Sequence, residues 1–155
     1  MIERTQTGPL IRASDTSDDA YDAVETALTR TSDARAGFET MVDKAEPSFR
    51  PVAQRFLDLH TRHAALLSAL LSDAGRAPDT DGSLMGTVNR AVVATRAFFD
   101  RIDDDVVRQI VQGEQSVVSA YGEALDSDLP AAERDILSGL LAELQTLVAE
   151  TRARA

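Results

Sequence analysis

Apolar residues recur at steps of three and four along four long segments of this chain, and this spacing constrains the fold more than any other feature. Such steps place side chains on one face of an α-helix. They predict helices over residues 17–45, 48–73 and 103–125, and from residue 130 toward the C-terminus. No segment shows the alternation of apolar and polar residues that is typical of a strand. The sequence therefore predicts an all-α fold.

Residues with known preferences for helix ends support these boundaries. Ser17 and the acids beside it suit the N-terminus of the first helix, and Pro51 suits the first turn of the second, where its missing N–H has no partner anyway. Gly75 is typical of the end of that second helix. Residues 1–16 lack an apolar period, so we expect a flexible N-terminal tail followed by one helical-bundle domain over residues 17–155.

The connections between the predicted helices differ in length, and their lengths predict the topology. The links after the first and third helices are short, so each joins two antiparallel helices. The link between the second and third helices is long enough to hold a further helix from about Ser83 to Arg101. Such a helix spans roughly 26 Å and returns the chain to the other end of the bundle. The second and third helices then run parallel, as in a ferritin-like four-helix bundle with an additional helix in the crossover; a five-helix bundle is the alternative.

The formal net charge of -10 argues against a nucleic-acid partner, because binding phosphates requires a basic surface. The same charge disfavours an anionic membrane surface, and no stretch has the length and apolarity of a membrane span or a signal peptide. The chain has no cysteine, which excludes a disulfide framework, a thiolate metal site and a cysteine nucleophile. We therefore expect a cytoplasmic protein that binds neither nucleic acid nor membrane.

Glu114 stands in the apolar stripe of the third predicted helix, where a carboxylate has no structural reason to be. The other members of this stripe are Val106, Ile110, Val117, Tyr121 and Leu125. Burying an unpaired carboxylate is costly, so Glu114 must be paired with a cation, bound to a metal or kept protonated. The expected partner in a structural buried pair is Arg35, which lies at helical spacing from Phe38 on the first helix. A hydrogen bond from His63 or Tyr121 is the alternative.

Histidines and acids on three of the predicted helices could instead form a metal site. The candidate ligands are His60, His63, Glu114, Glu143 and Glu150. A ferritin-like di-iron site uses Glu-x-x-His on two helices, and this chain contains no Glu-x-x-His, so we expect no full di-iron centre. A single divalent metal such as Fe, Mn or Zn is easier to bind, since imidazole and carboxylate suit all of them. The competing interpretation places His63 in the core as a hydrogen-bonded residue, His60 at the core boundary, and Glu143 and Glu150 in solvent.

Short motifs distributed along the predicted helices form an ordered set. They are Asp33-Ala34-Arg35-Ala36-Gly37-Phe38, then Gly82-Ser83 with Gly86 and Asn89-Arg90, then Gly113-Glu114 with Tyr121 and Ala124-Leu125, and finally Leu129-Pro130 with Arg134. Over about residues 20–152 their order and spacing resemble a bacterial ferritin-like domain family of unknown function. The resemblance implies a ferritin-like bundle and brings no established activity. This chain departs from the family pattern at Asn89 and Glu150, where the family often has histidine.

Motifs that would indicate catalysis are missing from the sequence. It has neither a glycine-rich phosphate-binding loop nor a nucleophile elbow, and an all-helical chain lacks the strands those motifs require. The expected function is therefore non-enzymatic: protein interaction or structural support by an acidic bundle that binds a protein partner or forms a homo-oligomer, without a cofactor. The alternative is a degenerate ferritin-like protein that binds one divalent metal through His63 and Glu114 for redox or storage chemistry.

Overall fold

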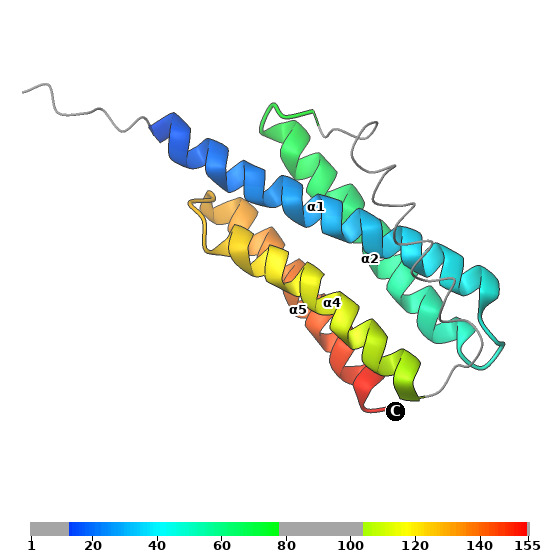
Figure 1. Ribbon diagram of the computed structural model, residues 1–155. Helices are drawn as coiled ribbons and strands as arrows, with labels where there is room; N and C mark the ends of the chain where they lie inside the picture. The colour runs from blue at the N-terminus through cyan, green and yellow to red at the C-terminus, as the bar shows by residue number, and fades with distance from the viewer. Residues whose placement is uncertain (1–12, 78–103, 155) are drawn as a thin grey trace, which may run out of the picture.

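Four α-helices make up the part of the chain that the structure, a computed structural model, describes: residues 13–77 and 104–154. They are α1 (Ala13–Lys44), α2 (Arg50–Asp73), α4 (Asp104–Leu125) and α5 (Ala131–Arg152), and none of the residues in these two ranges forms a strand (Figure 1). The all-α prediction is confirmed. The crossover helix predicted over residues 83–101 lies outside the described ranges.

Helix α1 begins earlier than the sequence indicated. Its first residue is Ala13, so residues 13–16, which we predicted as part of a tail, belong to the helix. Ser17 therefore lies inside α1 and does not cap its N-terminus, which corrects the predicted boundary. The physical reason is that a helix can extend beyond the residues that pack in the core, so an apolar stripe does not mark its first turn.

The four helices pack lengthwise as a bundle (Figure 1). Helix α1 packs against α2 and α4, and α5 packs against α4 and α2. A short turn joins α1 to α2 and another joins α4 to α5, so each of these pairs is antiparallel. Contacts between α2 and α4 advance in the same direction along both helices, from His60 with Glu114 to His63 with Tyr121. Helices α2 and α4 therefore run parallel.

Apolar side chains from all four helices fill the interior of the bundle. Fully buried examples are Val24 of α1, Leu67 and Leu71 of α2, and Leu137 and Leu144 of α5. Phe38 and Phe56 stack with ring centroids 4.8 Å apart, which joins α1 to α2. Burial of these apolar stripes is the main favourable term that brings the helices together. None of the helices within residues 13–77 and 104–154 is long and apolar enough to cross a membrane.

Helix α2 begins at Arg50, two residues after the predicted start, and ends at Asp73 as predicted. Pro51 lies in the first turn. At the other end Gly75 adopts a φ of 79°, and the N–H groups of Gly75 and Arg76 donate to the carbonyl oxygens of Ser72 and Leu71. These two bonds form a Schellman motif, in which a residue with a Cβ atom is strained at the position of Gly75.

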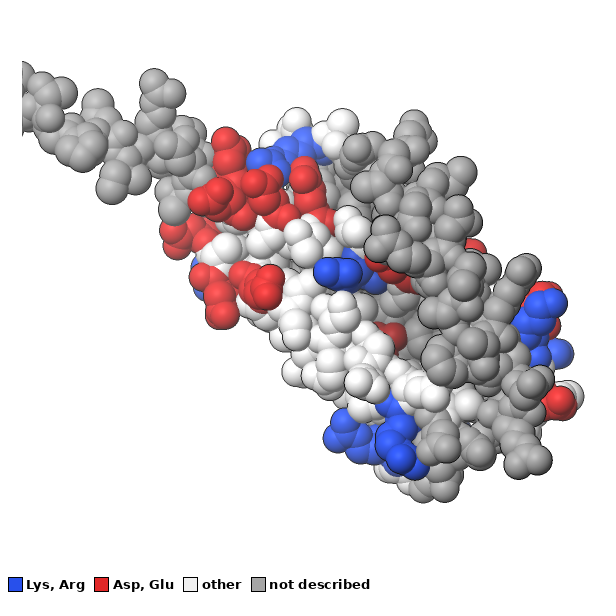
Figure 2. All heavy atoms as spheres, viewed as in Figure 1, with Lys and Arg blue, Asp and Glu red and all other residues white. Residues whose placement is uncertain are grey.

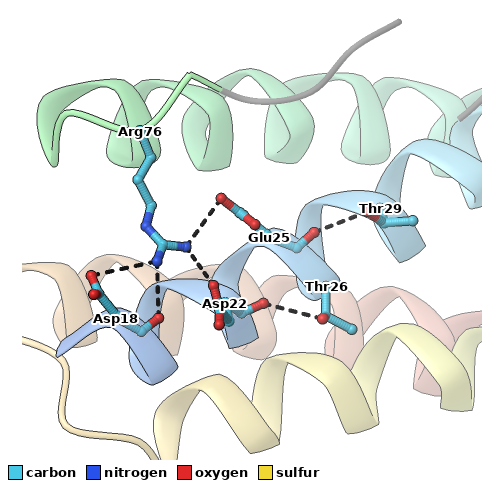
Figure 3. A network of polar contacts seen from close by, with 6 residues as sticks. All are labelled: Asp18, Asp22, Glu25, Thr26, Thr29 and Arg76. Atoms are coloured by element: carbon cyan, nitrogen blue, oxygen red, sulfur yellow. Dashed lines mark hydrogen bonds and ion pairs between the residues drawn. The ribbon is translucent and has the colours of Figure 1, made fainter. Parts of the chain in front are cut away.

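Arg76, which directly follows this turn, ties the end of α2 to α1 (Figure 3). Its guanidinium group donates to carboxylate oxygens of Asp22 at 2.6 Å and Glu25 at 3.1 Å, and to the main-chain oxygen of Asp18 at 3.2 Å. Asp22 raises the pKa of Arg76 further by this hydrogen bond. The position at which the chain leaves α2 is therefore held by three successive turns of α1.

The same end of the bundle carries a surface patch of acidic side chains over the beginning of α1 (Figure 2). Beneath it the guanidinium carbon of Arg76 lies 5.8 Å from the ring centroid of Tyr21, and the Tyr21 hydroxyl donates to Glu133 of α5 at 2.8 Å. Opposite charges, an aromatic ring and a hydroxyl thus connect α1, the end of α2 and α5.

Candidate functional site

His60 and His63 lie one turn apart on α2, and both are fully buried at 0% exposed. For His63 this agrees with the predicted core position. For His60 it corrects the prediction, which placed that residue at the core boundary. The reason is that α2 lies between α1 and α5, so its buried face is wide enough to hold both histidines.

The partner of Glu114 is His60. The Nε2 atom of His60 lies 3.1 and 3.0 Å from the two carboxylate oxygens of Glu114, which is only 2% exposed. The buried pair of Arg35 and Glu114 that we predicted is not formed: no ion pair joins these two described residues, and Nε of Arg35 is buried without a hydrogen-bond partner. Helical spacing places a residue on a face, but the offset between helices decides which residue it meets.

Aromatic rings surround the His60 side of this pair. The ring of His60 stacks on Phe38 at 5.7 Å and on Phe56 at 6.4 Å between centroids. Its Nε2 atom is the ring nitrogen that faces the carboxylate. Its Nδ1 atom is buried and has no hydrogen-bond partner in the described part of the chain. Among residues 13–77 and 104–154, Glu114 is therefore the single polar contact that positions this ring.

A second set of contacts begins at His63 and joins all four helices. The Nε2 atom of His63 lies 2.8 Å from Oε2 of Glu143 on α5, and its Nδ1 atom lies 3.1 Å from the hydroxyl of Tyr121 on α4. That hydroxyl lies 2.9 Å from Oγ1 of Thr31 on α1. Oγ1 of Thr31 is also 2.8 Å from the carbonyl oxygen of Ala27. We call these four side chains, Thr31, His63, Tyr121 and Glu143, the cross-bundle chain.

The pKa directions fix where the protons of the cross-bundle chain lie. Burial lowers the pKa of His63 below 6.5, and the hydrogen bond with Glu143 opposes it. Hydrogen bonds from His63 and Arg62 lower the pKa of Glu143. At neutral pH a neutral His63 thus donates from Nε2 to an ionised Glu143, and its Nδ1 accepts from Tyr121. Burial raises the pKa of Tyr121 to about 12, which keeps that hydroxyl protonated.

Outside the cross-bundle chain, a groove of about 530 Å³ lies between α2 and α5. Its lining residues are Arg55, Asp58, Leu59 and Arg62 of α2, and Gly139, Ala142, Glu143, Thr146, Leu147 and Glu150 of α5. Ion pairs of 2.5 Å between Arg55 and Glu150 and of 2.8 Å between Arg62 and Glu143 join the two helices. Glu143 is therefore shared by the groove and the cross-bundle chain.

Comparison with known protein families places part of the chain. The model of the family described as Domain of unknown function (DUF2383) matches residues 19–127. The chain belongs to this family. The DUF2383 match contains most of α1 and all of α2 and α4, and it ends before α5. No curated protein and no solved structure matches the chain.

The candidate metal ligands of this DUF2383 chain fall into three separate places. His60 lies with Glu114, His63 lies with Glu143, and Glu150 pairs with Arg55. No hydrogen bond joins His63 to Glu114, the two residues we expected to share a metal. Among the described residues no group of three or more His, Asp or Glu side chains is arranged to hold a metal ion.

Thr31 is the member of the cross-bundle chain whose role the sequence analysis missed. It is fully buried on α1, and the only signal for it was a polar residue within an apolar stripe, the same signal that singled out Glu114. Threonine carries little weight in such a search because its hydroxyl can bond to its own helix, as Thr31 does to Ala27.

Proposed function

We propose that this chain is a ferritin-like bundle without catalytic activity, which acts through its surface as a protein-interaction or structural module. The observation that carries the proposal is the cross-bundle chain, which takes one side chain from each helix. The side chains of Thr31, His63 and Tyr121 are buried and bonded within this chain, so they hold the helices in register. Glu143 is the member that reaches the surface, where it is paired with Arg62.

The directions of the helices support the ferritin-like part of the proposal. Two antiparallel pairs, α1 with α2 and α4 with α5, are combined so that α2 and α4 run parallel. A bundle built of two hairpins with one long connection has this arrangement. The lack of cysteine fits a cytoplasmic location, which we include in the proposal.

The groove between α2 and α5 supports a role for the surface. Leu66 of α2 and Ile136 of α5 are 42% and 46% exposed, although large apolar side chains are usually buried in a bundle. Both belong to the helices that border the groove. Exposed apolar side chains beside charged groups are typical of a surface that binds another protein.

A single divalent metal such as Fe, Mn or Zn is the second candidate, and the pair of His60 and Glu114 favours it. The separations of 3.0 and 3.1 Å between Nε2 and the carboxylate oxygens also suit two ligands of one ion. Ligands at about 2.1 Å from a metal stand about 3 Å apart when they bind at a right angle. Histidine and glutamate are ligands for each of these metals.

Metal analysis distinguishes the two candidates. Tag-free protein is loaded anaerobically with Fe(II), Mn(II) or Zn(II), freed of excess metal, and measured by plasma mass spectrometry beside the double variant His60→Leu/Glu114→Met. This variant replaces the pair by apolar side chains of similar volume, so the fold is kept. We expect equal, substoichiometric metal in both proteins. One metal per chain in the wild type and none in the variant would overturn the first proposal and support the second.

A further inference from the structure

The exposed face formed by α2 and α5 carries a charge pattern that complements itself. Helix α2 contributes Arg55 and Arg62, and α5 contributes Glu150 and Glu143. Each arginine is level with a glutamate, since the two ion pairs join them directly. Asp58, the remaining charged residue of the groove, accepts a hydrogen bond from Gln54 on its own helix. One helix of the face is therefore positive where the other is negative.

The apolar residues of this face follow the same register. The ion pairs show that α2 and α5 are antiparallel, so each step forward on α2 corresponds to a step back on α5. Leu66 is then level with Gly139, and Ile136 is level with Ala69. Leu66 and Ile136 are exposed large side chains. A Cβ atom built on Gly139 would meet nothing within 4 Å, so each large residue stands opposite a small one.

A twofold axis that runs parallel to the helices, in the plane of this face, satisfies both the charge pattern and the pairing of large with small residues. It lays α2 of one copy over α5 of the other and leaves the level of every residue unchanged. Arg55 and Arg62 of one copy then meet Glu150 and Glu143 of the other, and Leu66 enters the space at Gly139. A twofold axis perpendicular to the helices sets α2 against α2 and brings arginines together. The charges therefore select the parallel axis.

We propose that α2 and α5 form the interface of a homodimer whose twofold axis is parallel to the helices. This inference rests on the proposed surface function and names its partner, a second copy of this chain. The face is two helices wide, about 20 Å, and about 33 Å long. It offers roughly 660 Å² per copy, and a standard interface buries about 800 Å² per partner. The face is also nearly neutral, with two arginines and three acids lining its groove, in a chain of net charge -10.

Charge reversal at one pair of positions tests the geometry. In a homodimer of Arg55→Glu, or of Glu150→Arg, positions 55 and 150 of opposing copies have the same sign, so we expect the dimer to be weakened about tenfold or more. An equal mixture of these two variants restores opposite signs at both contacts and should form a heterodimer. The double variant Arg55→Glu/Glu150→Arg should dimerise alone. Sedimentation velocity over a range of concentrations measures each mass against the 16.7 kDa chain.

Tryptophan substitutions at two glycines, one inside the face and one outside it, test the apolar contact. Gly139→Trp fills the space that Leu66 of the other copy enters, and we expect it to give a monomer. Gly113→Trp places the same side chain on α4, outside the face, and should leave the dimer intact. Both glycines are exposed, and a Cβ atom on either has no neighbour within 4 Å, so both positions leave room for a side chain to begin. Circular dichroism of each variant checks that the bundle is folded.

A wild-type protein that is monomeric at every concentration would overturn the homodimer, and the partner of this face would then be a different protein. A dimer that is insensitive to both charge reversals and to Gly139→Trp would overturn this interface. Neither result changes the metal content measured for the wild type and for His60→Leu/Glu114→Met. Failure of the homodimer is therefore distinguishable from failure of the proposed function.

Discussion

Replacing each of the two tyrosines by phenylalanine compares a buried hydroxyl with a partly exposed one. The Tyr121 hydroxyl contacts Nδ1 of His63 at 3.1 Å and Oγ1 of Thr31 at 2.9 Å inside the core. The Tyr21 hydroxyl contacts Glu133 at 2.8 Å near the surface. Both substitutions remove a tyrosine hydroxyl oxygen. A difference between their effects on the free energy of unfolding therefore reports the environment of that oxygen.

The contacts set the expected magnitude for Tyr121→Phe. Thr31 keeps a partner, because its hydroxyl can donate to Ala27, but Nδ1 of His63 is left buried without one. A stranded buried group costs about 1–3 kcal/mol, so we expect the free energy of unfolding to fall by about 2 kcal/mol. For a chain of this length that lowers the melting temperature by about 4–8 °C. Water replaces the Tyr21 contact, and Tyr21→Phe should cost about 0.5 kcal/mol.

Urea unfolding followed by circular dichroism gives both free energies. A loss for Tyr121→Phe that is no larger than the loss for Tyr21→Phe would refute the reasoning, because the cross-bundle chain would then contribute nothing to stability. Alkaline pH gives a second readout. The pKa of Tyr121 is raised from 10.0 to about 12 in the folded chain, so its contribution is complete below pH 10 and is lost as the pH rises toward 12. Tyr121→Phe should lose less stability over that interval than the wild type.

Three further predictions concern stability measured by urea unfolding. Burial lowers the pKa of His63 below 6.5, so the unfolded chain binds that proton more readily, and the free energy of unfolding should fall as the pH drops below 6.5. His63→Gln should flatten the plot of unfolding free energy against pH in this range. The same plot for wild type and variant would contradict the conclusion that His63 is buried in its neutral form. Gly113→Ala should raise the free energy of unfolding by about 1 kcal/mol, since it has open space on a helix, whereas Gly75→Ala should lower it by about 1 kcal/mol because of its φ of 79°; equal signs would contradict the turn geometry. Glu114→Met should cost about 3 kcal/mol of unfolding free energy, because it leaves His60 buried without a partner. The double variant His60→Leu/Glu114→Met should cost less than the sum of His60→Leu and Glu114→Met; additive losses would argue against the pair.

The helices were predictable because their signal is local. Apolar steps of three and four mark the buried faces of α2, α4 and α5, and Gly75 marks the end of α2 by a backbone conformation that other residues resist. The burial of Glu114 followed from its place in such a stripe. The start of α1 was missed because an apolar stripe does not mark its first turn.

The contacts of the site depend on quantities that one helix does not contain. Whether Glu114 meets His60 or Arg35 is decided by the relative positions of α2, α1 and α4 along the bundle axis. The width of the buried face of α2, which places His60 in the core, depends on how closely α1 and α5 approach it. Tertiary packing sets both, and periodicity carries no information about them.

The cross-bundle chain also restricts how such a sequence can diverge. Each of its four positions lies on a different helix, and a change at any one leaves a neighbour on another helix without its bond. We therefore expect a lone substitution at position 31, 63, 121 or 143 to be selected against, and joint replacement of the buried residues by apolar ones to be tolerated. Among descendants of a common ancestor these positions should covary as a quartet, and positions packed by apolar contact alone should drift independently.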